Sequence, residues 1–305
     1  MKIAFCIDDI EEQAVDTLFQ EEADAAQQLG IRYELVDFEA IRKREPLRAA
    51  RFIKAEDKPV PTLYRGWMLT PTEYQTLDEA LQLKNHFLIT SPKAYQLCHW
   101  FPENYEIIRR VTPESVWISF SDQRPSHEEI HQHLKELRDS GLIVKDYVKS
   151  QKHYWEEACY IPKASDREQV EHVVDRFLEL QGDDLQGGLV FRKAVELEPL
   201  GCPLPGKFPQ SVEYRIFVFH GDVVATTPTW NSDYPKEKPP VHEFLPYLRS
   251  IDSPFFSCDL ALQTDGKWII VEIGDGQVSG LPDSCKVTEF YQSIQKRWES
   301  VERAT

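Results

Sequence analysis

The 305-residue sequence has no apolar run that approaches the length needed to cross a membrane. A spanning helix needs about 18 or more consecutive apolar residues. The short apolar stretch at the start, MKIAFCIDDIEEQ, runs directly into acidic residues, which is typical of a first strand rather than of a signal peptide. We therefore expect a cytoplasmic protein that works away from membranes.

Basic residues are scarce: 35 Lys and Arg stand against 51 Asp and Glu, and the formal net charge is -16. Surfaces that bind nucleic acids or anionic membranes in general need clustered Lys and Arg, so this balance argues against both. A local basic pocket for phosphate groups stays compatible with it. The six cysteines contain no CxxC pair and several lie in apolar runs, which indicates reduced thiols.

Common phosphate and metal motifs are missing as well. There is no GxGxxG, and the near match GCPLPGKF at 201–208 has prolines where N–H donors are needed and ends in Phe208 instead of a metal-binding hydroxyl. His127, His131 and His133 lie in an expected helix without HExxH spacing, and we interpret them as a solvated helix face. Any nucleotide or metal site must use other residues.

The first third of the chain alternates strands and helices. A strand over Lys2–Ile7, a helix over Glu11–Leu29 and a strand over Ile31–Phe38 form a crossover unit, which implies a parallel sheet. Arg65 lies within the later apolar run Val60–Leu69. An arginine in such a run needs a carboxylate or phosphate partner, supplied either by the protein or by a substrate.

Cations also interrupt apolar strands in the middle of the chain. Lys145 ends one such strand, and Lys149 is expected on the same strand face, ahead of the polar stretch 150–154. This arrangement suits a phosphate contact beside a mobile lid, while a charge that protects an edge strand is the alternative. Arg192 and Lys193 interrupt the next apolar strand in the same way.

An antiparallel strand pair follows over Glu213–Thr227. Arg215 shares its strand face with Phe217 and Phe219. An arginine at the end of an aromatic face leaves a packed surface, so we expect it to reach toward something anionic.

The stretch Phe255–Gly280 is the most informative part of the sequence. Asp265 and Gly266 predict a two-residue hairpin loop, and with that loop Asp259 lies opposite Glu272. Carboxylates about 5 Å apart repel by roughly 3 kcal/mol at an effective dielectric near 20, so the pair needs a cation, a shared proton or a basic partner. A hard divalent ion, Mg²⁺ first, meets this need. A slipped register with both acids at a solvated edge is the alternative.

The same register predicts the two faces of the hairpin. The apolar face is expected to carry Cys258, Leu260, Leu262, Ile269, Val271 and Ile273. The other face is expected to carry Asp259, Ala261, Gln263, Trp268, Ile270 and Glu272. Replacing Glu272 with alanine should then leave the protein folded or more stable, because the repulsion between the carboxylates is relieved.

The order of these features resembles the ATP-grasp superfamily, and most of all its R2K clade. The similar stretches are LYRGWML, SPKAYQLCHW, GLIVKDYVKS, VFRKAVELEP, EYRIFVFHGDVVA, CDLAL and VEIGDGQVSGLP. The resemblance implies an α+β fold in which two ATP-grasp subdomains hold the nucleotide between them behind an α/β lobe. We expect the α/β lobe over 1–110, the small subdomain with its phosphate loop over 111–188, and the subdomain with the metal site over 189–305.

The resemblance implies roles for the cations. Lys145 would hold the ATP phosphates with Lys149 nearby, and 150–155 would form the phosphate loop, although this stretch lacks the family's usual glycines. Arg215 would face the γ-phosphate or the acyl phosphate. Arg65 is the expected anchor for a carboxylate substrate, because the first lobe should face the cleft.

The resemblance also implies the adenine and metal contacts. The strand around Lys193–Leu197, with Lys193, Ala194 and Val195, would form the hinge at the adenine edge, and Glu196 or Glu198 would lie near the ribose. Oxygen ligands for one or two Mg²⁺ or Mn²⁺ ions would come from a different set. The family has an asparagine two positions after the metal-binding glutamate, whereas this chain has a glycine there. The expected metal ligands are therefore Asp259 and Glu272, with Asp275 or Gln277, or water, in place of the missing amide at Gly274.

The function that the resemblance implies is ATP- and Mg²⁺-dependent carboxylate–amine ligation through an acyl phosphate. The substrates would be a small-molecule or peptide carboxylate and an amine, and the product an amide or peptide-type bond. Phosphoryl transfer to a non-carboxylate acceptor is one alternative. A nucleotide-binding regulatory protein with little turnover is another. The identity of the substrates and the oligomeric state stay open.

Overall fold

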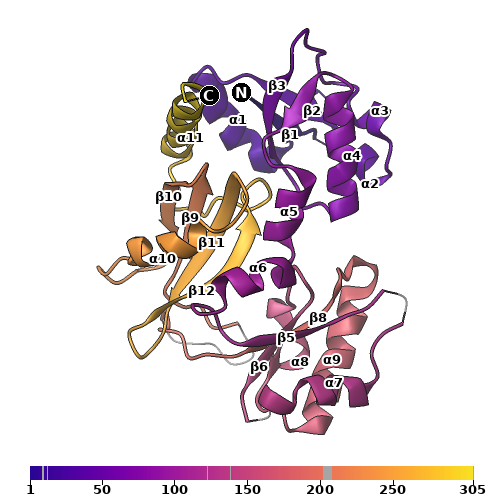
Figure 1. Ribbon diagram of the computed structural model, residues 1–305, viewed down its shortest axis with the longest axis vertical. Coiled ribbons are helices and arrows are strands. Elements are labelled where there is room, and N and C mark those ends of the chain that lie inside the picture. Colours follow the sequence, from indigo (N-terminus) through magenta and orange to yellow (C-terminus); the bar gives the residue numbers. More distant parts are fainter. Residues whose placement is uncertain (9, 12, 122, 138, 202–207, 305) are drawn as a thin grey trace.

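The computed structural model describes residues 1–305 except 9, 12, 122, 138, 202–207 and 305. This part of the chain forms three lobes, each built on a four-stranded sheet. The N-terminal and small lobes lie at opposite ends of the molecule, and the sheet of the C-terminal lobe lies between them (Figure 1). The α+β architecture expected from the sequence is confirmed.

The N-terminal lobe contains a parallel sheet in the order β2-β1-β3-β4, as the crossover pattern predicts. Its strands are β1 (Lys2–Cys6), β2 (Tyr33–Val36), β3 (Val60–Arg65) and β4 (His86–Leu88). The helices are α1 (Gln20–Gln28), α2 (Phe38–Arg42), α3 (Pro46–Ala49), α4 (Pro71–Gln82), α5 (Pro92–His99) and α6 (Phe101–Ile108). Helix α1 begins later than expected, because Val15 instead pairs with Ile7 in an isolated bridge and Asp16 caps a short 3-10 turn.

The small lobe contains an antiparallel sheet in the order β5-β8-β6-β7. Its elements are β5 (Ser115–Ser119), α7 (His127–His133), β6 (Leu142–Lys145), α8 (Trp155–Ala158), β7 (Tyr160–Ile161), α9 (Arg167–Gln181) and β8 (Gly188–Lys193). Strand β8 lies inside this sheet, so the lobe extends to Lys193 instead of ending at 188.

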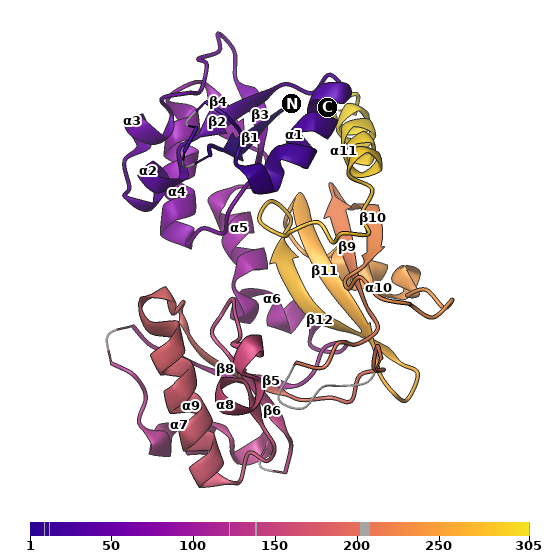
Figure 2. The ribbon, with the colours of Figure 1, turned by 180° about the vertical axis from the view of Figure 1, so that it is seen from behind.

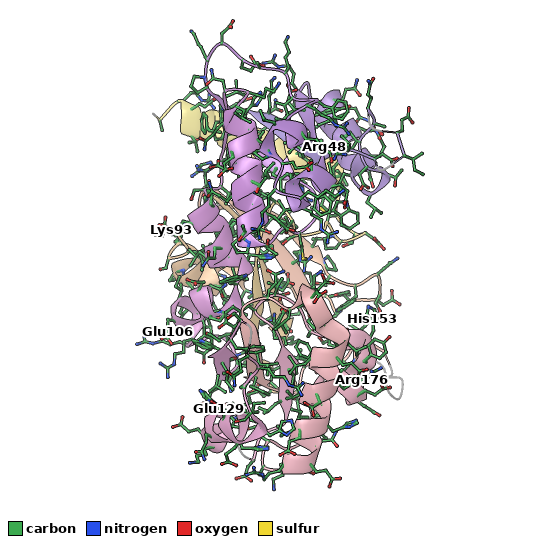
Figure 3. The ribbon with its side chains drawn as sticks, turned by 90° about the vertical axis from the view of Figure 1, so that its right-hand side faces the viewer. Arg48, Lys93, Glu106, Glu129, His153 and Arg176 are labelled. Atoms are coloured by element: carbon green, nitrogen blue, oxygen red, sulfur yellow. The ribbon has the colours of Figure 1, made fainter. Side chains whose placement is uncertain are left out.

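Helices α7 and α9 cover one face of the small lobe's sheet. Glu129 on α7 is exposed, and Arg176 on α9 is partly exposed and pairs with Glu179 of the same helix (Figure 3). His131 is covered, because its Nε2 lies 2.8 Å from a carboxylate oxygen of Glu171 on α9 and its side chain is only 8% exposed. The prediction that these histidines form a solvated face is therefore wrong at this position.

The C-terminal lobe contains an antiparallel sheet in the order β10-β9-β11-β12. Its elements are β9 (Glu213–Phe219), β10 (Asp222–Pro228), α10 (Val241–Leu248), β11 (Phe255–Leu262), β12 (Trp268–Asp275) and α11 (Val287–Glu302). One face of the sheet packs an apolar core against α5, α6 and α10. The opposite face changes along β9 from Phe219 and Phe217, which are fully buried, to Arg215 and Glu213.

The β11–β12 hairpin places Asp259 opposite Glu272, as predicted, although its loop is different. The Gln263 N–H donates to the Lys267 carbonyl, so the loop has three residues, with Gly266 in the left-handed region at φ +86°. A bulge in β12 then shifts the register beyond Asp259. The two departures from the predicted pairing cancel at the acidic pair.

The bulge changes the faces of β12. Ile270, predicted to lie beside Glu272, is fully buried in the apolar core with Ile273, whereas Ile269 and Val271 are partly exposed. The predicted apolar face of β12 is therefore wrong at these positions, because the extra residue of the bulge reverses the alternation between 270 and 272.

The N- and C-terminal lobes share one apolar core. Ile3 and Phe5 of β1 lie in the same cluster as Phe217 of β9, Phe255 of β11 and Phe290 of α11. Helix α11, at the end of the chain, lies beside α1 of the first lobe (Figure 2). The two lobes therefore form one continuous packed unit.

Two general expectations concern the described part of the chain. None of its helices is both long and apolar enough to cross a membrane. No disulfide joins its cysteines, in line with the thiols expected from the sequence; Cys202 lies outside the described residues.

Candidate active site

Charged side chains gather where the C-terminal lobe meets the small lobe. On β11, Asp259 lies directly across from Arg215 of β9, and its two carboxylate oxygens accept hydrogen bonds from Arg215 Nε at 2.8 Å and Nη2 at 2.7 Å. Burial alone would lower the pKa of Arg215, but the Asp259 carboxylate outweighs it and raises the pKa. The anionic partner expected for Arg215 is, in this structure, Asp259.

The second acid of the pair is joined to the small lobe. Lys145, at the end of β6, donates to Glu272 Oε1 at 2.9 Å. Burial would raise the pKa of Glu272, but the cations of Lys145 and then Lys152 lower it to about 2. Each of the two facing carboxylates is thus neutralised by its own cation. A basic partner is one of the three arrangements that the sequence predicted for two facing carboxylates.

Arg192 is a cation of this junction that the sequence prediction missed. It is buried, and its Nη2 donates to Thr112 Oγ1 at 2.7 Å and to the Ile270 carbonyl at 3.1 Å. Its guanidinium also lies over the ring of Phe101, 5.4 Å from the centroid. Burial lowers the pKa of Arg192 to about 10. The neighbouring Lys193, predicted to bind the cofactor, is exposed, because adjacent strand residues point to opposite faces.

The connector after β8, predicted to contact adenine and ribose, already uses several of its backbone groups. The Ala194 N–H donates to the Gly141 carbonyl at 2.8 Å, and the Glu196 carbonyl accepts from the Thr264 N–H at 3.1 Å. The Glu198 N–H donates to the Leu262 carbonyl at 2.7 Å. The predicted hinge residue Val195 lies between Ala194 and Glu196, whose backbone groups already make these hydrogen bonds.

Lys149 does not continue the strand that carries Lys145. Strand β6 ends at Lys145, and the next residues form a turn in which Asp146 Oδ1 accepts from the N–H groups of Val148 and Lys149, both at 2.6 Å. The predicted shared face for the two lysines is therefore wrong, because this turn breaks the alternation of the strand.

The expected phosphate loop instead directs Lys152 toward the C-terminal lobe. The Lys152 ammonium lies 4.9 Å from the centroid of the Phe208 ring. The Trp155 ring contacts the same ring edge to face, with 5.4 Å between the ring centroids. Phe208 in turn contacts Trp230. Aromatic contacts thus connect this loop across the junction, and Lys152 adds a cation that no prediction had singled out.

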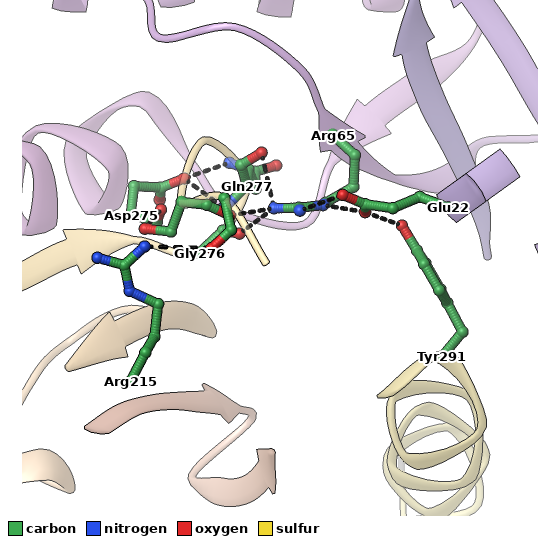
Figure 4. A network of polar contacts seen from close by, with 9 residues as sticks. Glu22, Arg65, Arg215, Asp275, Gly276, Gln277 and Tyr291 are labelled. Atoms are coloured by element: carbon green, nitrogen blue, oxygen red, sulfur yellow. Dashed lines mark hydrogen bonds and ion pairs between the residues drawn. The ribbon is translucent and has the colours of Figure 1, made fainter. Parts of the chain in front are cut away.

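Arg65 lies away from this junction, in the contact between the N- and C-terminal lobes (Figure 4). It is fully buried, and Glu22 accepts from its Nε and Nη2, both at 2.7 Å. Its Nη1 donates to the carbonyls of Gly276, Gln277 and Ser279. The prediction that Arg65 binds a carboxylate substrate is wrong for this structure, because the protein itself supplies its carboxylate.

Asp275 and Gln277, proposed from the sequence as replacement metal ligands, are fully buried next to this contact (Figure 4). Gln277 accepts from the Tyr64 N–H and donates to the Tyr74 hydroxyl and to Asp275 Oδ1. Burial raises the pKa of Asp275 to about 7, although hydrogen bonds from Gln277 lower it. Because β12 alternates, Asp275 points to the face opposite Glu272, so neither residue completes the site as predicted.

Glu213 is a third acid on the charged face of the sheet, and the sequence prediction did not single it out. It precedes Arg215 by two positions on β9 and is only 7% exposed. Burial and, next, the charge of Asp259 raise the pKa of Glu213 to about 8. The sequence could have indicated this site, because an acid two positions before Arg215 in a strand lies on the same face.

The junction has the donor set that a hard divalent cation prefers. Asp259 and Glu272 offer carboxylate oxygens from facing positions on neighbouring strands, and both are held in place by cationic partners. These residues fit Mg²⁺ or Mn²⁺, and Lys145 and Lys152 are the cations closest in effect to Glu272.

The fold is that of the ATP-grasp enzymes. The crystal structure of D-cycloserine synthetase DcsG superposes with a TM-score of 0.61 at 13% identity, covering 97% of this chain and 99% of that chain. The RimK domain protein ATP-grasp from Sphaerobacter thermophilus DSM 20745 gives 0.60 at 12% identity, with 97% and 98% covered. The ATP-grasp ligase PsnB, complexed with minimal precursor, Mg and ADP, gives 0.56 at 11% identity, with 97% and 98% covered.

The sequence specifies the branch of this fold. Residues 133–298 match the ATP-grasp domain of R2K clade family 3, and the chain belongs to that family. No curated protein matches the sequence.

Proposed function

We propose that this chain is an ATP- and Mg²⁺-dependent carboxylate–amine ligase that forms an amide or peptide-type bond through an acyl phosphate. The proposal depends on one observation: Asp259 and Glu272 face each other on neighbouring strands, and each is paired with a cation, Arg215 or Lys145, at the junction of two lobes. Membership of the ATP-grasp family and structural neighbours that are ligases support it.

Nucleotide binding would exchange the partners of these charges. Lys145 would turn from Glu272, and Lys152 from the Phe208 ring, to the ATP phosphates. The carboxylates of Asp259 and Glu272 would hold Mg²⁺. Bound Mg²⁺ would supply charge neutralisation at the phosphates. Arg215, once separated from Asp259, would be free to face the phosphoryl group that is transferred.

The reaction consists of two displacements. A carboxylate oxygen of the substrate attacks the γ-phosphorus, the bond from that phosphorus to the ADP oxygen breaks, and an acyl phosphate forms. An amine nitrogen then attacks the acyl carbon, the carbon–oxygen bond to phosphate breaks, and the nitrogen loses a proton. ADP, phosphate and the amide are the products, and the protein contributes positioning and positive charge rather than a nucleophile.

The substrates are proposed as a small-molecule or peptide carboxylate and an amine. The structural neighbours that support this range are a D-cycloserine synthetase, named for a small-molecule product, and the ligase PsnB complexed with a precursor peptide. Because Arg65 is paired with Glu22 away from the junction, a different group must anchor the carboxylate.

Hydroxylamine trapping tests the proposed chemistry. The full chain is incubated with Mg-ATP, hydroxylamine and pools of amino acids and short peptides, and hydroxamate and ADP are both measured. Hydroxamate that depends on an added acid is expected. ADP release without hydroxamate would assign a non-carboxylate acceptor, and nucleotide binding without turnover would assign a regulatory role; either result refutes the ligase proposal.

Replacing Lys145 tests the placement of the phosphates. Lys145→Ala should weaken ATP binding by about tenfold or more, since a charge-assisted contact contributes roughly 1.5–3 kcal/mol. Lys163→Ala is the matched control, because Lys163 is a lysine of the same lobe whose side chain is 58% exposed. Calorimetric titration with ATP measures both variants, and equal affinities would contradict the assignment.

A further inference from the structure

The position at which the family carries its metal-binding asparagine is closed in this chain. A Cβ atom built on Gly274 would lie 2.9 Å from Ser257 Oγ and 3.1 Å from Ser279 Oγ. These two hydroxyl groups lie 2.7 Å apart in a hydrogen bond, and Ser279 Oγ also donates to the Asp275 carbonyl at 2.8 Å. The glycine is therefore part of a packed arrangement, and no ligand side chain fits at this position without displacing the serines.

The acids and amides that follow Gly274 do not replace the missing ligand. Asp275 lies on the face of β12 opposite Glu272, and Gln277 follows the end of that strand. Both are fully buried and joined to each other by hydrogen bonds. A third oxygen ligand from the protein must therefore come from another strand on the face that carries Asp259 and Glu272.

Glu213 occupies such a position. On β9 it shares the face of Arg215, and its direct cross-strand neighbour on β11 is Ala261, two residues from Asp259. Ala261 has only a methyl group, and Asp259 is the diagonal neighbour of Glu213, at a separation that long side chains span in antiparallel sheets. Within the described residues, Glu213 is buried and its carboxylate makes no hydrogen bond or ion pair.

We propose that Glu213 supplies a third carboxylate oxygen to the divalent cation held by Asp259 and Glu272, in place of the ligand that Gly274 cannot provide. The inference rests on the metal site of the proposed function. A buried carboxylate without a partner is costly unless it is paired or coordinates a metal. Three carboxylates also raise the negative charge of the site, and greater ligand charge strengthens the binding of hard cations.

The proposal has a consequence that can be measured without turnover. A site with three carboxylates binds Mn²⁺ before any nucleotide supplies phosphate oxygens, whereas a site with two carboxylates depends more on the nucleotide. In the free protein Arg215 donates two hydrogen bonds to Asp259, so metal binding must displace this guanidinium from the Asp259 oxygens.

Mn²⁺ binding to the full chain tests the proposal, with and without ADP. The bound fraction is measured from the electron paramagnetic resonance signal of the free ion. Glu213→Gln should weaken nucleotide-free binding by at least about tenfold. It should also add a water to the bound ion, measured by water proton relaxation. Glu243→Gln, an exposed acid on α10, is the control and should bind as the wild type does.

The outcomes separate the inference from the function on which it rests. Unchanged affinity and hydration in a folded Glu213→Gln variant would overturn the role of Glu213 while leaving the two-carboxylate site intact. Absence of Mn²⁺ binding by the wild type with ADP present would instead refute the metal site itself, and with it both proposals. Melting temperatures establish that each variant is folded; if Glu213→Gln does not fold, Glu213→Asp, which withdraws the carboxylate by one methylene, takes its place with the same expected losses.

Discussion

Replacing Arg65 with methionine should destabilise the protein strongly without involving the chemistry of the nucleotide. The substitution leaves the Glu22 carboxylate in a buried site, where the Tyr291 hydroxyl is its one remaining side-chain donor among the described residues. It also removes the donor shared by three backbone carbonyls. Removing one partner of a buried ion pair costs about 3–5 kcal/mol. For a chain of this size, a loss of that order lowers the melting temperature by on the order of 10 °C.

Scanning calorimetry of the ligand-free protein measures this loss. Arg109→Met is the matched control, because Arg109 is 66% exposed and its pair with Glu106 is a surface pair within one helix; its effect should stay below about 0.5 kcal/mol. Combining Arg65→Met with Glu22→Met should recover part of the stability, since no charge is then left buried.

The opposite result would restore the substrate role predicted from the sequence. If Arg65→Met melts like the wild type, and the variant instead shows a raised KM for the carboxylate substrate with unchanged kcat, then Arg65 contacts the substrate. The bidentate contact with Glu22 would in that case be replaced when the substrate binds.

Two further predictions concern the pH dependence of stability. The pKa of Glu272 is about 2 in the folded protein and near 4.5 in the unfolded chain, so its charged form stabilises the fold above pH 4.5 and this stability is lost as pH falls toward 2. The difference between the two pKa values corresponds to about 3.4 kcal/mol of unfolding free energy. Because the side chain is 38% exposed, solvent screening reduces this to about 1–2 kcal/mol. Glu272→Gln should therefore lower the melting temperature at pH 7 more than at pH 3, and a stabilised variant would contradict the Lys145 contact. Asp275 has the opposite effect on the pH dependence of stability, because its pKa is raised in the folded protein. Stability is lost as pH rises from about 4 to about 7, by on the order of 4 kcal/mol for this buried group. Asp275→Asn should raise the melting temperature at pH 8 and flatten its pH dependence between 4 and 7, and an unchanged pH profile would show that the carboxyl group does not titrate in this range.

The acidic hairpin shows how local patterns predict a site without predicting its details. Strand periodicity and the Asp265-Gly266 signal placed Asp259 opposite Glu272, which is correct. The loop is one residue longer than predicted, and the bulge near Val271 compensates for it. A bulge depends on packing across the sheet, so periodicity alone could not reveal that Ile270 turns into the core.

Partners that are distant in sequence account for the other differences. A buried arginine was predictable at position 65, but its partner Glu22 lies on a helix whose docking depends on the complete fold. The same holds for Lys145, whose contact with Glu272 reverses the expectation that removing this acid is neutral or stabilising. Strand alternation separates Arg192 from Lys193 but does not select between them, since Val190 on the face of Arg192 and Phe191 on the face of Lys193 are both fully buried.

The core that joins β1 to α11 also has a consequence for biosynthesis. When β1 leaves the ribosome, Ile3 and Phe5 have no cover on the face that Phe290 and Ile294 later contact. Nearly the entire chain must be translated before that face is covered. Until then its exposed apolar surface makes the nascent chain prone to aggregation. The first lobe to be synthesised is thus among the last to be completed, and chaperone binding during translation would fall on this face.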